Sequence, residues 1–460
     1  GGAMKRIRIG NGCGFWGDNL DAPLRLAEAG HLDYLTLEYL AELTMSILAH
    51  QTSREADAGY VTDFPLVLES LLPELKRQPQ LKIVTNAGGM NPAACARQAA
   101  RVLCGAGLGD VPIGVATGDD LLPRLDELLA AGEPFAHLDN EEPLGDLRSE
   151  VVSANAYLGA AGIVGALESH ARIILTGRVA DASLTVGPAM HAFGWTWDDW
   201  DKLAAASVAG HLIECGAQMT GGMFSGWSED VRLADVGHPI AEIGGDGSVV
   251  VAKPDGSGGA VTTATVAEQL VYEIGDPTAY LTPDVTADFS AVRLTQAGPD
   301  RVEVAGACGR PAPERLKVSL AYRDGHAVSG MIVVCGPGAR QTALAAAEIV
   351  FDRVRQAGFE LTQTHAECLG TGDALRGIWP RHDDGFEVVL RLAARSKSRE
   401  AVERLAREIA PLVTSGPPGI TGYVGARPKP HPVLAFWPTT IDRSRVLPQA
   451  VVQSAGEWNA

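Results

Sequence analysis

Four polar or reactive side chains recur at helical spacing between residues 197 and 220. Positions i, i+3, i+4 and i+7 share one face of a helix, and here they hold His211, Glu214, Cys215 and Gln218. A histidine beside a carboxylate is a common general acid–base pair, and a nearby thiol can act as a nucleophile. Taken singly, each residue has a structural explanation, because a buried cysteine is usually inert and one histidine–glutamate pair does not bind a metal. As a group, they predict a catalytic or binding stripe.

A second set of candidates follows the predicted parallel strands. Ligands of open α/β sheets bind beyond the carboxyl ends of the strands, so the turns at that edge are the place to search. Five turns carry glycine or polar residues in place of packing residues, and their candidate binding residues are Gly12, Gly14, Asp18, Glu38, Glu42, Asn86, Gly88, Gly89, Asn91, Asp119, Asp120, Thr176, Arg178 and Asp181. Five such turns on one edge predict a site.

The first turn contains the spacing GxGxxG at Gly12, Gly14 and Gly17. Glu38 lies where a dinucleotide-binding fold places its ribose-binding acid. The pattern is weak in a chain with 53 glycines, and Asp18 would lie unfavourably beside a pyrophosphate. The alternative is a tight turn that needs positive φ.

Two further turns could hold an anion. In the segment from Asn86 to Pro92, Asn91 is expected to cap a helix that begins at Pro92, and free amides at a helix N-terminus attract a phosphate, a carboxylate or an oxyanion. The structural alternative is a capped helix with a glycine turn. Arg178 can hold a carboxylate or phosphate through two hydrogen bonds, whereas Asp181 either serves catalysis, caps the next helix or pairs with Arg178.

The elements that must position these residues change character along the chain. Residues 4–225 are predicted to form a Rossmann-like, doubly wound parallel sheet, because buried apolar runs alternate with amphipathic helices. The expected strands are 5–9, 34–37, 82–85, 112–116 and 172–176. Residues 226–460 are expected to form an α+β second domain, with a ferredoxin-like arrangement as the specific hypothesis. The acidic segment 132–153 is interpreted as a solvated excursion or a lid.

Composition restricts the class of protein. A net charge of −18 without a basic block argues against nucleic acid as a partner. Apolar runs are too short to span a membrane. Seven scattered cysteines indicate reduced thiols and a cytoplasmic location. The carboxylates on the strand-end turns are too dispersed to predict a metal-binding site. A homo-oligomer is expected on general grounds.

Several stretches also resemble the acyclic terpene utilisation (AtuA) family of bacterial catabolic proteins. The resemblance extends from about Lys5 into the 440s, is most specific over 155–222, and rests on GNGCGFWGD, DYLTLEYLAELTM, TNAGGMNP, NAYLGAAGIVGAL, TGRVADASL, GHLIECGAQMTGG and EQLVYEIGDPTAYLTPDV. It implies a role beside acyl-CoA carboxylases, hydratases and lyases that degrade branched terpenoid or related acids. It assigns no catalytic residue.

The leading hypothesis is a catabolic enzyme that acts on a branched or hydroxylated acyl-CoA or on the matching acid. Hydration, dehydration, C–C cleavage and thioester hydrolysis all fit. His211 and Glu214 would be the acid–base pair and Cys215 a possible nucleophile, while Arg178 and the amides near Gly88 would hold a substrate oxygen. No cofactor is needed beyond CoA as part of the substrate. The alternatives are an NAD(P)-dependent oxidoreductase and a non-catalytic or partner-dependent subunit.

Overall fold

The computed structural model describes residues 4–460, which form two compact units. The larger unit contains the chain up to residue 148 together with residues 152–320 and 437–460. The smaller unit contains residues 149–151 and 321–436. The units therefore do not divide the chain at the expected position between 225 and 226, because residues 226–320 and 437–460 add strands to the sheet of the larger unit.

A ten-stranded mixed sheet forms the centre of the larger unit, in the order β11-β12-β8-β7-β1-β2-β3-β6-β4-β19. Its parallel strands are β1 (Arg6–Asn11), β2 (Tyr34–Leu37), β3 (Lys82–Thr85), β6 (Ile173–Thr176) and β4 (Pro112–Thr117). The antiparallel strands are β7 (Ile240–Gly244), β8 (Val249–Ala252), β12 (Arg301–Ala305), β11 (Arg293–Gly298) and β19 (Gln449–Ser454). All five predicted parallel strands are present.

The order of these strands departs from the dinucleotide-binding fold. In that fold the first strand lies at the centre of the sheet, where the strand order reverses. Here β1 borders the antiparallel strand β7, and the order of the parallel strands reverses where β6 lies between β3 and β4. The larger unit is therefore a mixed α/β fold without the predicted Rossmann order.

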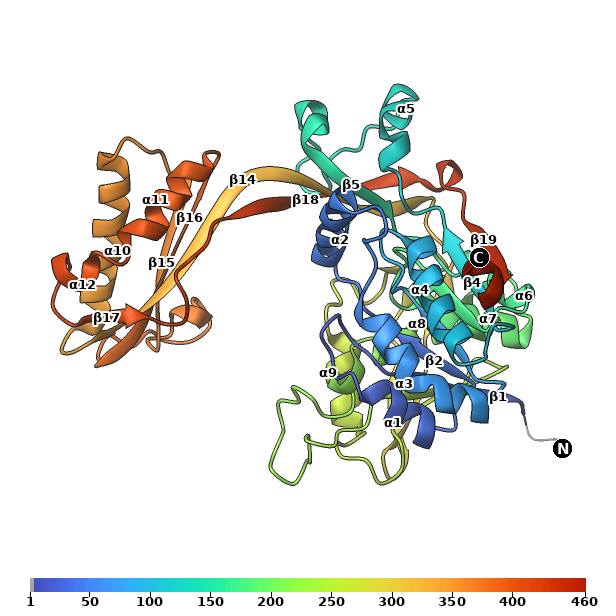
Figure 1. Ribbon diagram of the computed structural model, residues 1–460. Helices are drawn as coiled ribbons and strands as arrows, with labels where there is room; N and C mark the ends of the chain where they lie inside the picture. The colour runs from blue at the N-terminus through green and yellow to red at the C-terminus, as the bar shows by residue number, and fades with distance from the viewer. Residues whose placement is uncertain (1–3) are drawn as a thin grey trace. The chain divides into compact units, whose positions relative to one another are not determined.

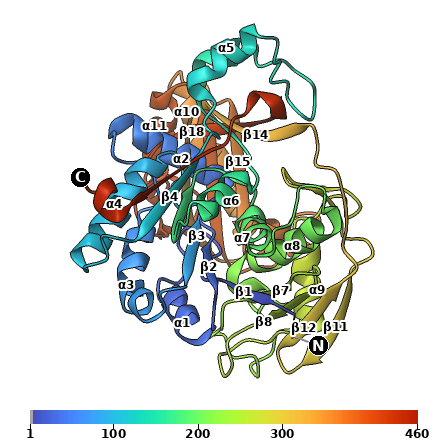
Figure 2. The ribbon, with the colours of Figure 1, turned by 90° about the vertical axis from the view of Figure 1, so that its right-hand side faces the viewer.

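Helices cover both faces of the parallel strands, as Figure 2 shows. On one side lie α1 (Ala22–Ala29), α3 (Asp63–Arg77) and α4 (Pro92–Gly105), whose apolar residues share a core with β2 and β3. On the other side lie α6 (Ala161–Glu168), α7 (Ser183–Phe193) and α8 (Trp200–Ile213). Burial from both sides explains why β2 and β6 consist of wholly buried residues.

The remaining elements of the larger unit lie in its connections. They are α2 (Glu42–Arg54), α5 (Leu125–Ala130), β5 (Val151–Ala156), α9 (Thr263–Val271), α13 (Ala455–Trp458) and a small sheet of β9 (Tyr280–Leu281), β10 (Thr286–Asp288) and β13 (Cys308–Arg310). In the acidic segment 132–153, Asp139, Glu141, Glu142, Asp146 and Glu150 are exposed, as expected of a solvated segment. Glu133 is the exception, since it is buried and forms ion pairs with Arg315 and Arg445. No helix within residues 4–460 is both long and apolar enough to cross a membrane.

The smaller unit has an antiparallel sheet in the order β15-β16-β14-β17. Its elements are β14 (Arg315–Cys335), α10 (Ala339–Gln356), β15 (Gln363–Leu369), β16 (Glu387–Ser396), α11 (Arg399–Glu408), α12 (Leu412–Ser415), β17 (Ile420–Tyr423) and β18 (His431–Asp442), which pairs with β14. Leaving out the one-turn α12, the order up to β17 is the β-α-β-β-α-β of the ferredoxin-like motif. Both long helices pack on one face of the sheet around Phe351 and Leu390 (Figure 1).

Candidate functional site

The predicted catalytic stripe is held by the end of α8. This helix ends at Ile213, earlier than the sequence suggested, so Gln218 lies on a separate 3-10 turn (Gly216–Gln218) and does not share the α-helical face. His211 and Glu214 are both buried, with exposed fractions of 2% and 8%. The carboxyl of Glu214 lies beside the imidazole, with Oε1 3.3 Å from Nδ1.

The hydrogen bonds of His211 assign the proton in this pair. Nε2 lies 2.9 Å from the carbonyl oxygen of Gln269 and 3.2 Å from that of Leu270, so it must donate, and Nδ1 of the neutral ring carries no proton and has no hydrogen-bond partner among the described residues. Burial lowers the pKa of His211. Burial also raises the pKa of Glu214 well above its ordinary value, with the charges of Asp181 and Glu273 adding to the effect. The pair therefore favours a neutral imidazole beside a protonated carboxyl.

A buried guanidinium lies at the carboxyl end of β6. Arg178 is 2% exposed and donates to the carbonyl oxygen of Leu40 at 2.9 Å and to Oδ1 of Asp181 at 2.6 Å. The Tyr157 ring lies 4.5 Å from its central carbon. Burial works to lower the pKa of Arg178, but Asp181 and the other acidic groups nearby outweigh it and raise the pKa. The guanidinium therefore stays charged and holds Asp181.

The turns after β2 and β3 contribute a second buried carboxyl. Oε1 of Glu38 accepts hydrogen bonds from Nδ2 of Asn86 at 2.6 Å and from the Leu40 amide at 2.9 Å. Asn86 in turn accepts from the Tyr39 amide at 2.9 Å, which fixes its orientation. Burial and then the charge of Asp181 raise the pKa of Glu38 well above its ordinary value.

Asp181 connects the two predicted groups of residues. Its negative charge raises the pKa of both Glu38 and Glu214, and Arg178 acts on both in the opposite direction. The Asp181 side chain is 36% exposed, whereas the other three are almost wholly buried. The strand-end turns and the α8 stripe therefore meet in one site, with Asp181 as its accessible carboxylate.

Sequence reasoning missed a tyrosine and a lysine beside Arg178. The hydroxyl of Tyr157 donates to Oε1 of Glu42 at 3.2 Å, and Nζ of Lys317 donates to the same oxygen at 2.5 Å. The Lys317 ammonium also lies 4.9 Å from the centre of the Tyr157 ring, on which Arg178 packs as well. Tyr157 belongs to a stretch quoted for the family resemblance, but nothing in the sequence pattern singles out Lys317.

Asp119, at the end of β4, positions the turn that carries Arg178. Its Oδ2 accepts hydrogen bonds from the Arg178 amide and from Nδ2 of Asn155, both at 2.9 Å. Burial raises the pKa of Asp119 to about 6, despite these two hydrogen bonds. Asp119 therefore holds the backbone of the turn that carries Arg178, and its pKa of about 6 lies within reach of a pH experiment.

The glycines of the GxGxxG segment serve internal packing. A Cβ on Gly12 would lie 2.9 Å from Cα of Pro23, and one on Gly14 would lie 2.6 Å from the carbonyl carbon of Cys215. Oδ2 of Asp18 accepts a hydrogen bond from the Gly14 amide at 2.8 Å. The carboxylate of the turn itself thus occupies the place where a pyrophosphate would bind this amide. Glu38 faces Asn86 instead of a ribose position. These contacts argue against the dinucleotide interpretation.

The turn after β3 is a glycine turn that leads into a capped helix, which was the structural alternative to an anion site. Asn91 caps α4, its side chain accepting from the Ala94 amide at 3.3 Å. The amides of Gly89 and Asn91 already donate to the carbonyl oxygens of Asn86 and Gly88, at 3.1 and 2.9 Å. A Cβ on Gly88 would lie 2.5 Å from the Thr176 carbonyl oxygen. The amides of Gly89 and Asn91 are therefore not free to hold an anion.

Two other predicted site residues have structural surroundings. Burial and the adjacent Glu214 raise the pKa of Cys215 to about 12, which disfavours the thiolate that a nucleophile requires. The Thr176 hydroxyl is wholly buried and donates to the carbonyl oxygen of Gly177 at 2.9 Å. Within residues 4–460, no group of three or more His, Cys, Asp or Glu side chains is arranged to hold a metal ion.

Comparison with known proteins gives one match. The model of a family described as acyclic terpene utilisation family protein AtuA matches residues 7–452, nearly the whole chain. The comparisons with curated proteins and with solved structures found no match to this chain. The matched range includes every residue of the site described above.

Proposed function

The chain belongs to the acyclic terpene utilisation family, and we propose that it is an enzyme that transfers protons on a branched or hydroxylated acyl-CoA or on the matching free acid. The observation that carries the proposal is the contrast between two carboxyls near one guanidinium. Asp181 is ion-paired with Arg178 and partly exposed, whereas Glu214 is buried and its pKa is raised. Titratable groups with opposed environments are the usual mark of an acid and a base in one site.

In this proposal Asp181 is the general base and Glu214 the general acid. Asp181 takes the proton from the carbon next to the carbonyl of the substrate, and Glu214 gives its proton to a hydroxyl on the following carbon. Water then leaves and a carbon–carbon double bond forms, and the reverse sequence adds water. Dehydration or hydration thus uses both carboxyls, whereas thioester hydrolysis through Cys215 would need a thiolate that its surroundings disfavour.

The neighbouring residues act through these two carboxyls. Arg178 donates hydrogen bonds to Asp181 and to the carbonyl oxygen of Leu40, so it is a positioning residue that orients Asp181. His211 packs beside the Glu214 carboxyl, with Nδ1 3.3 Å from Oε1, and helps to hold this carboxyl in place. Lys317, whose side chain is about half exposed, supplies a cation beside Tyr157 for the anionic part of a substrate.

The test is turnover of methyl-branched enoyl-CoA and hydroxyacyl-CoA thioesters, followed by loss or gain of the double bond and by deuterium uptake from heavy water. Removing a general acid or base commonly costs about a hundredfold to ten-thousandfold in rate. We expect losses of that size in Asp181→Asn and Glu214→Gln. The matched control is Glu303→Gln, an exposed carboxyl on β12 that should leave the rate unchanged.

Different outcomes would favour different functions. Equal rates in Asp181→Asn and in the wild type would sink the assignment of the base. Turnover that requires NAD would favour the oxidoreductase, and absence of turnover with every thioester would favour a partner-dependent subunit.

A further inference from the structure

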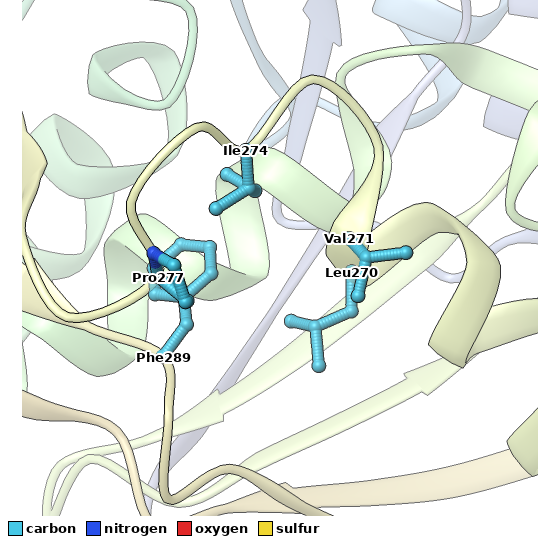
Figure 3. A pocket seen from close by; sticks show the side chains of 5 residues that line it. All are labelled: Leu270, Val271, Ile274, Pro277 and Phe289. Atoms are coloured by element: carbon cyan, nitrogen blue, oxygen red, sulfur yellow. The ribbon is translucent and has the colours of Figure 1, made fainter.

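A small apolar pocket lies beside α9 in the larger unit. Its volume is about 130 Å³, and every residue that lines it is apolar: Leu270, Val271, Ile274, Pro277 and Phe289. Figure 3 shows Leu270 and Val271 on one side of the pocket and Pro277 and Phe289 on the other. The side chains that line this pocket offer no hydrogen bond to a ligand, so the pocket selects mainly by shape and by burial of hydrocarbon.

Two residues in the wall of the pocket contact His211. The carbonyl oxygen of Leu270 accepts from Nε2 of His211 at 3.2 Å, and the Phe289 ring lies 5.6 Å from the imidazole. Tyr280 contacts both rings, at 5.1 Å from Phe289 and 5.8 Å from His211. His211 thus lies beside a wall of the pocket, and its imidazole is also the neighbour of the Glu214 carboxyl.

The segment that forms the pocket also carries an acid that acts on Glu214. Glu273 lies between Val271 and Ile274 and has a φ of +60°, a left-handed conformation that non-glycine residues rarely adopt. Its charge raises the pKa of Glu214. Backbone strain of this kind persists where the surrounding structure enforces it, often at binding sites. One short segment therefore provides an apolar wall and tunes the catalytic carboxyl.

We infer that this pocket binds the alkyl end of the substrate and selects a compact, branched end of about four to six carbons. An apolar cavity of about 150 Å³ binds benzene, so a pocket of about 130 Å³ fits a group of that size. Val271 and Pro277 are exposed, so the pocket is open to solvent, and further carbons of a long straight chain would lie outside it. The inference rests on the proposed function, because the acyl group must extend from the carboxyls near Asp181 toward α9.

The first experiment measures binding of CoA thioesters by calorimetry. Each buried carbon contributes about fourfold in affinity, so isovaleryl-CoA should bind at least tenfold more tightly than acetyl-CoA, and octanoyl-CoA should gain nothing further. Ile274→Trp fills the pocket and should abolish this difference while acetyl-CoA binding is kept. Leu281→Trp, an exposed position on the neighbouring strand β9, is the matched control.

A second measurement separates the pocket from the proposed function. Isoamyl alcohol, which carries a branched end without any carboxyl group, is titrated into wild-type protein with labelled methyl groups. Selective shifts of the Leu270, Val271 and Ile274 methyls support the pocket, even if no thioester is turned over. The inference is overturned if those methyls do not shift, if Ile274→Trp keeps the chain-length preference, or if raising the protein concentration alone produces the shifts, which would assign the pocket to a second copy of the chain.

Discussion

At the scale of single residues, the electrostatics of the site are set by three carboxyls that lie near one guanidinium. Glu38, Asp181 and Glu214 lie near one buried guanidinium, Arg178, and only Asp181 forms an ion pair with it. The two glutamates are left with burial and like charge, both of which favour the protonated form. The single arginine thus pairs with Asp181, while burial raises the pKa of the two glutamates.

Asp119 gives a pH test of this electrostatic arrangement. Its pKa in the folded chain is about 6, against an ordinary value of 3.8. The protonated form of Asp119 therefore contributes its full share to the free energy of unfolding below about pH 4, and this contribution is lost as pH rises through 6. The difference corresponds to about 3 kcal/mol. We expect Asp119→Asn to gain stability relative to the wild type between pH 4 and 7, as measured by urea unfolding.

The asparagine keeps an oxygen for the amide of Arg178 and for Asn155, so the turn should survive the substitution. Glu303→Gln serves again as the exposed control, with an unfolding curve that follows the wild type at every pH. Parallel curves for Asp119→Asn and the wild type would show that Asp119 titrates at its ordinary value.

How far the residues could be predicted depended on how local their contacts are. His211 and Glu214 were paired correctly because their spacing within one helix determines the contact. The ion pair of Asp181 with Arg178, one of the predicted alternatives, is likewise local in sequence and is confirmed. The effect of Asp181 on Glu214 and the position of Lys317 beside Tyr157 were not predictable in this way, because they arise from segments that only the fold brings together. The burial that disfavours a reactive Cys215 thiolate likewise has no sign in the local sequence.

At the scale of elements, the turn after β1 is fitted against the end of α8. A Cβ on Gly14 would lie 2.6 Å from the carbonyl carbon of Cys215 and 2.7 Å from its oxygen. Neither is a side-chain atom that could rotate away. The same α8 end carries Glu214, so the packing of this turn sets the position of the proposed acid.

Gly14→Ala should therefore destabilise the protein and reduce turnover. Overpacking of this kind costs about 1–3 kcal/mol, and the displaced backbone would move Glu214. Gly105→Ala is the matched control, because a Cβ at that position in α4 meets no atom within 4 Å and should stabilise the helix by about 0.5–1 kcal/mol. Thermal unfolding and turnover of both variants test the expectation, and equal melting temperatures for the two would contradict it.

The existence of the parallel strands was easier to predict than their order. Continuous apolar runs such as residues 173–175 predict a strand that is buried on both faces. They do not say which strand is the neighbour, because pairing depends on contacts distant in sequence. The insertion of β6 between β3 and β4, and the pairing of β7 with β1, are choices of this kind.

At the scale of the whole molecule, each unit has a hydrophobic core of its own. One core is built around residues such as Leu68, the other around residues such as Phe351. The boundaries between the units fall inside regular elements, namely the strands β5, β14 and β18 and the 3-10 helix Gly145–Glu150, where no flexible linker signals a division. The change of texture near residue 226 instead marks the point where parallel strands give way to antiparallel ones.

Separate cores predict separate responses to cavities. Phe351→Ala should cost about 3–5 kcal/mol and Leu68→Ala about 2–5 kcal/mol, because each leaves a buried cavity. In hydrogen exchange followed by mass spectrometry, Phe351→Ala should speed exchange in α10 and β16 and leave β2 and β3 unchanged, and Leu68→Ala should do the reverse. Thioester binding should survive Phe351→Ala, because every residue of the proposed site lies in the larger unit. Faster exchange in both units with either variant would mean that the two cores unfold as one.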